Sequence, residues 1–106
     1  MSALSHLKVL DLSRVLAGPW ASQILADLGA EVIKVENPAG RDDTRGWGPP
    51  FLRDEVGEAT AESAYFLCTN RGKRSVCIDM KTAAGRAALR ELAKDCDVLI
   101  ENFKVG

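Results

Sequence analysis

Two sets of cations in this sequence have the type and spacing suited to binding an anionic ligand. Arg71, Lys73 and Arg74 lie within four residues, just before a run that is typical of a β-strand. Such a cluster could hold the phosphates of a nucleotide, and a solvated, charged loop would have the same composition. Lys81 and Lys104 each follow a strand-like run directly, which is the better place to reach a ligand at a sheet edge. Either is equally compatible with a surface lysine.

A turn near the N-terminus is a further candidate anion site. Gly18 and Pro19 lead into an expected helix, where free N–H groups and the helix dipole favour a phosphate. The sequence has no G-x-G-x-x-G and no Walker pattern, so a tight turn that packs the helix on a sheet is the preferred interpretation of these two residues.

The acidic residues form no complete catalytic constellation. Asp42 and Asp43 are adjacent, but no carboxylate has a base, a nucleophile or a metal-binding partner at a useful spacing. His6, the only histidine, precedes the first expected strand and is expected at the surface. We therefore predict no catalytic residue and no metal site in this sequence.

The composition is that of one small globular domain, with 106 residues, 46% hydrophobic and 27% charged. A formal net charge of -1 provides no field that would attract nucleic acid or a membrane, so neither is an expected partner. The three cysteines have no C-x-x-C pairing and fit neither a zinc site nor a disulfide framework. With no visible signal peptide or membrane-spanning run, a reduced, cytoplasmic protein is expected.

The first third of the sequence predicts a strand, a helix and a second strand. Residues 9–12 are a short β-type run, and apolar residues at helical spacing follow from Pro19 to Leu28, with Gly29 suited to the left-handed position just past the helix. Residues 31–36 alternate and are rich in β-branched side chains. Residues 37–62, rich in Gly, Pro and charges, are expected to form a long functional or mobile loop.

The remaining sequence repeats the pattern. Residues 75–79 predict a third strand, Thr82 is a plausible N-cap of a helix with an apolar face reaching Cys96, and residues 97–101 predict a fourth strand. This order predicts an α/β fold, a Rossmann-like parallel sheet with crossover helices. Because no helix follows to cover the fourth strand, we expect residues 1–106 to be an incomplete N-terminal region.

Ligands of open parallel sheets bind outside the carboxyl ends of the strands, which makes four segments candidates for the site. They are residues 13–18, 37–45, 80–82 and 102–104.

Several ordered motifs, covering nearly the whole chain, resemble the start of family III (CaiB/BaiF-type) CoA-transferases. They are residues 9–19, 28–36, 70–75, 79–81 and 97–103. The resemblance implies a larger, interlaced homodimeric enzyme whose N-terminal Rossmann-like region binds coenzyme A. It also implies transfer of CoA from an acyl-CoA to a carboxylic acid acceptor, through an aspartyl intermediate whose aspartate lies beyond this chain.

The resemblance further implies which residues contact CoA, and they lie within or directly before three of the four candidate segments. They are Val15, Leu16, Ile78, Asp79, Met80, Lys81, Asn102, Phe103 and Lys104. A family arginine after the second strand is replaced by Asn37, and Arg41 could substitute for it. Residues 42–51 look like the branch that handles dicarboxylic acids such as succinate and glutarate. Arg14 could meet a substrate carboxylate or serve as a structural ion-pair partner.

Three other functions are compatible with the sequence. The α-methylacyl-CoA racemases resemble this sequence in the Gly-Lys-Arg-Ser and Asp-x-Lys stretches, and a shared fold does not determine the reaction. A CoA- or nucleotide-binding module without catalysis would need no catalytic residue beyond this chain. A nicotinamide-dependent dehydrogenase would have an acidic residue at Glu36, but the glycine fingerprint is absent.

Overall fold

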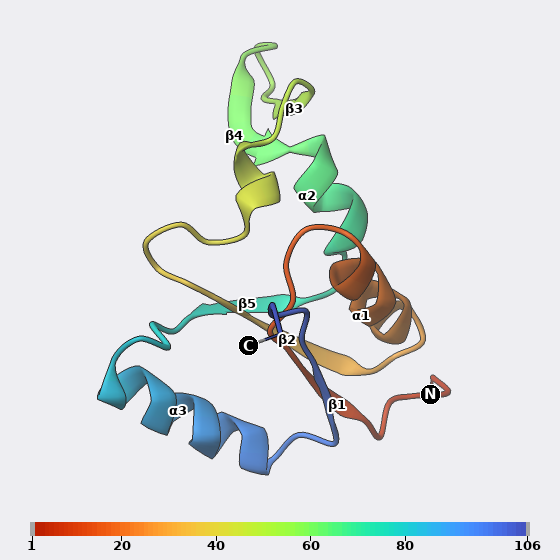
Figure 1. Cartoon of the computed structure of the whole chain (residues 1–106). Coiled ribbons are helices and arrows are strands. Elements are labelled where there is room, and N and C mark those ends of the chain that lie inside the picture. Colours follow the sequence, from red (N-terminus) through yellow and green to blue (C-terminus); the bar gives the residue numbers. More distant parts are fainter. Residues whose placement is uncertain (1, 106) are drawn as a thin grey trace.

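A computed structural model of the chain, which describes residues 2–105, contains a four-stranded parallel sheet (Figure 1). Its strands are β1 (Lys8–Asp11), β2 (Glu31–Glu36), β5 (Arg74–Cys77) and β6 (Val98–Ile100), in the order β5-β2-β1-β6. All three neighbouring pairs are parallel. The four predicted strands and the parallel α/β fold are therefore confirmed, with small shifts at the strand ends.

Two helices cover opposite faces of this sheet. Helix α1 (Ala17–Asp27) contributes Leu25 and Ala26 to a cluster built on Val9 and Val32. On the other face, α3 (Ala83–Lys94) contributes Leu89, Leu92 and Ala93 to a cluster built on the neighbouring strand residues Leu10 and Val35. Successive side chains of a strand alternate between faces, so the strand residues supply both cores. Figure 1 shows the two helices on either side of the strands.

The apolar residues of α1 do not all face the sheet as their spacing predicts. Ile24 and Leu28 are 51% and 48% exposed, and with Trp20, at 55%, they form an outer stripe at i, i+4 and i+8. The inner face uses Leu25 together with small or polar side chains such as Ser22, which is fully buried. The prediction of the helix is confirmed, but the expected inner face is partly wrong.

The expected long loop is wrong in detail, because the structure contains further elements there. A 3-10 helix, η1 (Asp43–Gly46), precedes an antiparallel hairpin of β3 (Phe51–Arg53) and β4 (Ala59–Ser63), and helix α2 (Ala64–Thr69) follows. Figure 1 shows this hairpin projecting from the sheet at the top of the view. The Trp47 and Tyr65 rings, with centroids 5.2 Å apart, connect its base to α2.

Two predicted helix boundaries are confirmed. Gly29 follows α1 with a φ of +104°, a left-handed conformation that glycine adopts without steric cost. Thr82 caps α3, because its hydroxyl accepts a hydrogen bond of 2.9 Å from the N–H of Gly85. A side chain at Gly85 would overlap with the carbonyl oxygen of Asp79, so this turn requires a glycine.

Within residues 2–105, no helix is long and apolar enough to cross a membrane.

Candidate functional site

Two adjoining hollows lie where the carboxyl ends of the parallel strands meet. One, of about 340 Å³, is lined by Leu12, Arg14, Val35, Asn37, Met80, Lys81 and Phe103. The other, of about 300 Å³, is lined by Arg14, Val15, Asn102, Phe103 and Lys104. Arg14 and Phe103 line both hollows, which therefore form one crevice. The strand order reverses between β1 and β6, and open parallel sheets bind ligands at such a reversal.

A third and larger hollow, of about 440 Å³, lies on the face of the sheet beside α3. Its lining includes Ile33, Val76 and Leu92, and none of the predicted contact residues. Arg74 and Ser75 also line it, but Arg74 is paired with Glu31. Size alone does not make it the site, because Lys81 and Lys104, which form no ion pair among residues 2–105, line the crevice.

Six of the nine residues predicted to contact CoA line the crevice, and all four candidate segments contribute to it. They are Val15, Met80, Lys81, Asn102, Phe103 and Lys104. The other three lie beside it. Leu16 is the N-cap residue of α1 and is 42% exposed, Ile78 packs in the core beneath α3, and Asp79 accepts the Lys81 N–H in the turn before α3.

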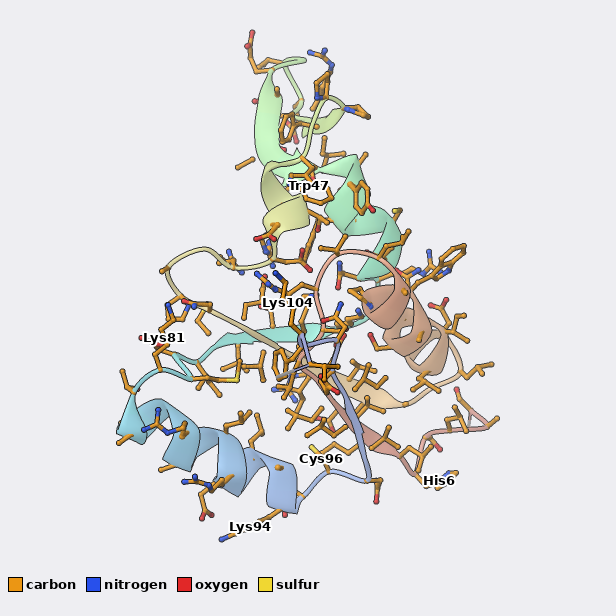
Figure 2. All side chains as sticks on the ribbon, in the orientation of Figure 1. His6, Trp47, Lys81, Lys94, Cys96 and Lys104 are labelled. Atoms are coloured by element: carbon orange, nitrogen blue, oxygen red, sulfur yellow. The ribbon has the colours of Figure 1, made fainter. Side chains whose placement is uncertain are left out.

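The three cations that line the crevice, Lys81, Lys104 and Arg14, differ in whether they form ion pairs. Lys81 and Lys104 are exposed, and neither forms an ion pair with another residue of the described chain, 2–105. Figure 2 shows Lys81 close to the start of α3 and Lys104 above the sheet. The Arg14 guanidinium lies 3.4 Å from the Asp43 carboxylate in an exposed ion pair, so the structural alternative for Arg14 is present.

The Arg71, Lys73 and Arg74 cluster is not an open phosphate site, because each cation has its own carboxylate. Arg71 pairs with Asp27 at 2.7 Å, Arg74 with Glu31 at 3.0 Å, and Lys73 with Asp11 at 3.0 Å. Lys73 is also buried, so the alternative of a solvated loop is wrong for this residue. The structure thus shows an ion pair for each cation, with the Lys73 pair buried and the Arg71 and Arg74 pairs exposed.

The Asp11–Lys73 pair is the centre of a buried network at the end of β1. Asp11 accepts hydrogen bonds from the N–H and hydroxyl of Ser13 and from the hydroxyl of Ser22. Burial raises the pKa of Asp11, but these hydrogen bonds and the Lys73 ammonium outweigh it and hold the pKa below its ordinary value. Burial lowers the pKa of Lys73 to about 8 despite the opposing pull of Asp11. Lys73 also donates to the carbonyl oxygen of Pro19, which ties the start of α1 to the segment before β5.

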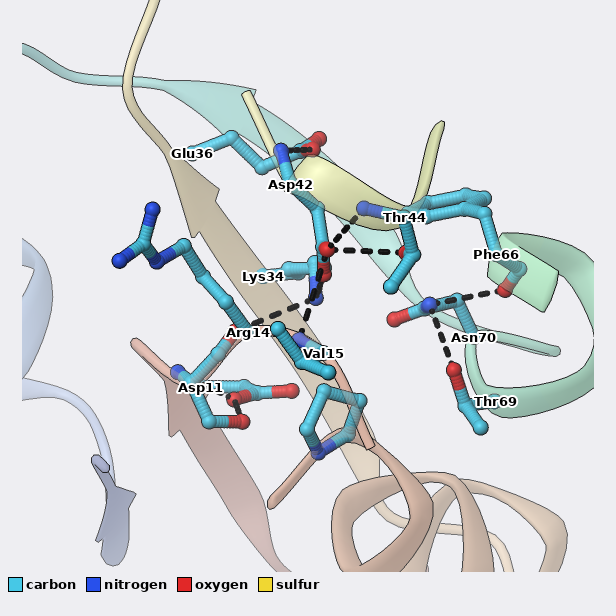
Figure 3. Close-up of polar contacts among 12 residues, drawn as sticks. Asp11, Arg14, Val15, Lys34, Glu36, Asp42, Thr44, Phe66, Thr69 and Asn70 are labelled. Atoms are coloured by element: carbon cyan, nitrogen blue, oxygen red, sulfur yellow. Dashed lines mark hydrogen bonds and ion pairs between the residues drawn. The ribbon is translucent and has the colours of Figure 1, made fainter. Parts of the chain in front are cut away.

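A second buried pair joins β2 to the segment after it. The Lys34 ammonium lies 2.7 Å from the Asp42 carboxylate, and both side chains are almost completely buried (Figure 3). Asp42 also accepts from the N–H and hydroxyl of Thr44. Burial raises the pKa of Asp42, but the hydrogen bonds from Lys34 and Thr44 outweigh this effect. The pKa is therefore held below its ordinary value, and the carboxylate stays charged.

Glu36 engages Arg41, the residue that the sequence suggested as a substitute for an expected arginine after β2. Arg41 donates to Glu36 at 3.2 Å, and the Arg45 guanidinium donates to both Glu36 oxygens at 2.8 and 2.9 Å. The backbone of Asp42 and the hydroxyl of Ser75 donate to the same carboxylate. Asn37 itself lines the crevice.

Stability should depend on Glu36 in the acid range. Burial raises its pKa, but the Arg45 pair and the other hydrogen bonds lower it to about 2, from an ordinary 4.5. Because the folded pKa is depressed, the stabilisation is fully present above about pH 4.5 and is lost as pH falls through about 2. We expect Glu36→Gln to reduce the free energy of unfolding by about 3 kcal/mol near neutral pH. The difference from the parent protein should shrink steadily in acid, as measured by urea unfolding. Glu91→Gln, in an exposed pair with Lys94, is the control and should show neither effect.

The sequence alone did not indicate the two buried pairs as parts of the site. Asp11 and Lys73 are 62 positions apart, and nothing in their local patterns connects them. One feature of the sequence could have indicated the pairs. Asp11 follows the apolar residues of β1, and Lys34 lies between apolar residues of β2. A charge that is buried in a sheet requires a partner.

In the part of the chain from 2 to 105, no group of three or more His, Cys, Asp or Glu side chains is arranged to hold a metal ion. His6 is exposed, as predicted.

The fold and the crevice together define an open parallel α/β domain with its candidate site at the carboxyl edge of the sheet. Residues 4–106 match the model of CoA-transferase family III, and the chain belongs to this family. This confirms the family indicated by the sequence motifs.

Individual relatives agree with this membership. The chain is 59% identical over 101 residues to a succinate–glutarate CoA-transferase of Agrobacterium fabrum, covering 95% of this chain and 25% of the relative. It is 50% identical over 106 residues to a succinyl-CoA:glutarate CoA-transferase of Mus musculus, covering 100% and 23%. The crystal structure of a CaiB/BaiF family protein from Brucella suis superposes with a TM-score of 0.86 at 55% identity, covering 97% of this chain and 26% of that one. The chain therefore spans about a quarter of the length of these relatives.

Proposed function

We propose that this chain is the CoA-binding region of an acyl-CoA:carboxylate CoA-transferase. The observation that carries the proposal is the crevice, which brings together six of the nine predicted contact residues from three separate segments. Its two adjoining hollows suit an elongated ligand, and the ammonium groups of Lys81 and Lys104, which form no ion pair among residues 2–105, suit the phosphates of CoA. The region then acts by binding and orienting the thioester, and fixing the reactants in this way accelerates a reaction.

The chemistry of the transfer requires a nucleophilic carboxylate, for which we propose an aspartate outside the residues of this chain. Its oxygen attacks the thioester carbonyl, the CoA thiolate leaves, and a mixed anhydride forms. The thiolate then attacks the aspartyl carbonyl and releases the donor acid as a carboxylate. The acceptor carboxylate attacks this enzyme thioester, which expels the CoA thiolate and forms a second mixed anhydride. The thiolate then attacks the acceptor carbonyl of this anhydride, which forms the acceptor acyl-CoA and frees the aspartate.

For the substrates, we propose a dicarboxylic acid acceptor, in line with the names of the relatives that act on glutarate and succinate. Arg14 lines both hollows and is exposed, so its guanidinium is available to a substrate carboxylate once the long ion pair to Asp43 opens.

We also propose that the whole protein is a homodimer in a reducing, cytoplasmic compartment. The exposed stripe of Trp20, Ile24 and Leu28 is apolar surface of the kind that packs against another part of a larger assembly. The three cysteines are free, which fits a compartment that keeps thiols reduced.

The test is CoA binding and transfer by the whole protein. We expect transfer from succinyl-CoA to glutarate, and we expect Lys81→Ala and Lys104→Ala each to raise the dissociation constant for CoA by about 10-fold, the effect of losing one charge-assisted contact. Isothermal titration measures the affinity. Lys94→Ala is the matched control, because Lys94 lies at the far end of α3 and pairs with Glu91 (Figure 2).

Three results would count against the proposal. Equal affinity in the Lys81, Lys104 and Lys94 variants would place CoA elsewhere. CoA binding without transfer by the whole protein would favour a non-catalytic module, and racemisation of an α-methylacyl-CoA without transfer would favour the racemase chemistry.

A further inference from the structure

The turn between β1 and α1 contains a backbone conformation that its sequence disfavours. Val15 has a φ of +77°, in the left-handed region. A β-branched residue rarely adopts it, because the branched Cβ collides with the backbone. Residues in such conformations persist only where the surroundings hold them, and they concentrate at functional sites. Val15 lines the crevice, so the groups that hold it also shape the site.

One of these groups is the side chain of Asn102, which binds the residue before Val15. Its Oδ1 accepts a hydrogen bond of 3.2 Å from the Arg14 N–H, and its Nδ2 donates one of 2.7 Å to the Arg14 carbonyl oxygen. Oδ1 and Nδ2 are the only polar atoms of this side chain, and the turn engages both. Asn102 follows β6, the strand beside β1 in the sheet, so the contact spans 88 positions of sequence.

The buried Lys34–Asp42 pair holds the same turn from the other side. The Lys34 ammonium donates to the Ser13 carbonyl oxygen at 3.2 Å, and the Val15 N–H lies 3.4 Å from Asp42 Oδ1. Figure 3 shows Lys34 and Asp42 above Arg14 and Val15. The turn is thus fixed on one side by a buried ion pair and on the other by a single amide at the exposed edge of the crevice.

We propose that the Asn102 side chain is a positioning group, which holds Val15 in its left-handed conformation and thereby shapes the β1–α1 turn for CoA. This inference rests on the proposed function. Because both polar atoms of the amide bond to Arg14, we expect the Asn102 side chain to act on affinity through the turn.

A double-mutant cycle with Val15→Gly tests this role. Glycine adopts positive φ as readily as negative φ, so a turn with glycine at position 15 depends less on the Asn102 amide. In the whole protein, Asn102→Ala should raise the dissociation constant for CoA by about 10-fold, and by only about 3-fold in the Val15→Gly background. Lys104→Ala is the control, since a residue that acts by direct contact should cost the same in both backgrounds.

Equal penalties for Asn102→Ala in the two backgrounds would overturn the proposal and indicate a direct side-chain contact. The urea unfolding midpoint gives a second cycle that needs no ligand. Asn102→Ala should lower this midpoint in the parent protein and lower it less when position 15 carries glycine. If the parent protein binds no CoA, the proposed function fails, and this second cycle still decides whether Asn102 holds the turn.

Discussion

Replacing Asp11 with alanine should reduce the free energy of unfolding of the whole protein by about 3–5 kcal/mol, the usual cost of breaking a buried ion pair by removing one partner. The Lys73 ammonium, whose side chain is 2% exposed, would be left without its carboxylate. The hydrogen bonds that the Asp11 carboxylate accepts from Ser13 and Ser22 would also be lost. Urea unfolding near neutral pH measures the loss.

Asp27→Ala is the matched control for Asp11→Ala. Asp27 pairs with Arg71, from the same basic cluster, but the two side chains are 39% and 66% exposed. An exposed pair contributes about 1 kcal/mol at most. A combined Asp11→Asn and Lys73→Met variant should recover part of the loss, because it removes both charges. Equal losses for Asp11→Ala and Asp27→Ala would show that burial of the pair has no energetic consequence.

Gly18→Ala should lower kcat/KM for CoA transfer by about 100-fold, the scale of loss that follows when a reacting group is displaced by about 1 Å. A side chain at position 18 would overlap with Cβ and Oγ of Ser13, which is itself held by Asp11. The overlap displaces the β1–α1 turn, and with it the crevice wall at Val15. Steady-state kinetics of the whole protein provides the measurement.

The Gly18→Ala result can be separated from a general loss of structure. Adding Ser13→Gly removes both atoms that the new methyl group meets, and should restore much of the activity. Adding Ser13→Ala keeps the Cβ and should not restore it. Gly46→Ala is the neutral control, since no atom lies within 4 Å of a Cβ built there. Full activity in Gly18→Ala would contradict the role of this turn.

The sheet and its two covering helices could be predicted because their signals are local. Alternation in β2 and the apolar face of α3, from Leu89 to Cys96, are visible in short windows of sequence, and the structure places both as expected. Crossover handedness and strand adjacency then restrict the assembly to a parallel sheet, which brings the post-strand segments to one edge.

The hairpin and the buried ion pairs could not be predicted for the opposite reason. β3 has three residues, two of them exposed, so it shows no alternation of apolar and polar side chains. The partners Lys34–Asp42 and Asp11–Lys73 come together only when separate elements pack, and a charged residue looks the same in sequence whether its partner is a protein carboxylate or a ligand. For this reason the sequence did not distinguish a phosphate site from protein ion pairs in the basic cluster at 71–74.

The position of β1 between β2 and β6 has a consequence for how the chain forms on the ribosome. β1 is made first, but its neighbour β6 follows much later, since Lys8 and Asp97, which bond across the two strands, are 89 positions apart. At about 5–20 residues per second, the interval is roughly 5–20 s. During that time one edge of β1 has no partner strand, and an unpaired edge is a template for aggregation. We therefore expect the nascent chain to be the form of this protein that most depends on chaperones.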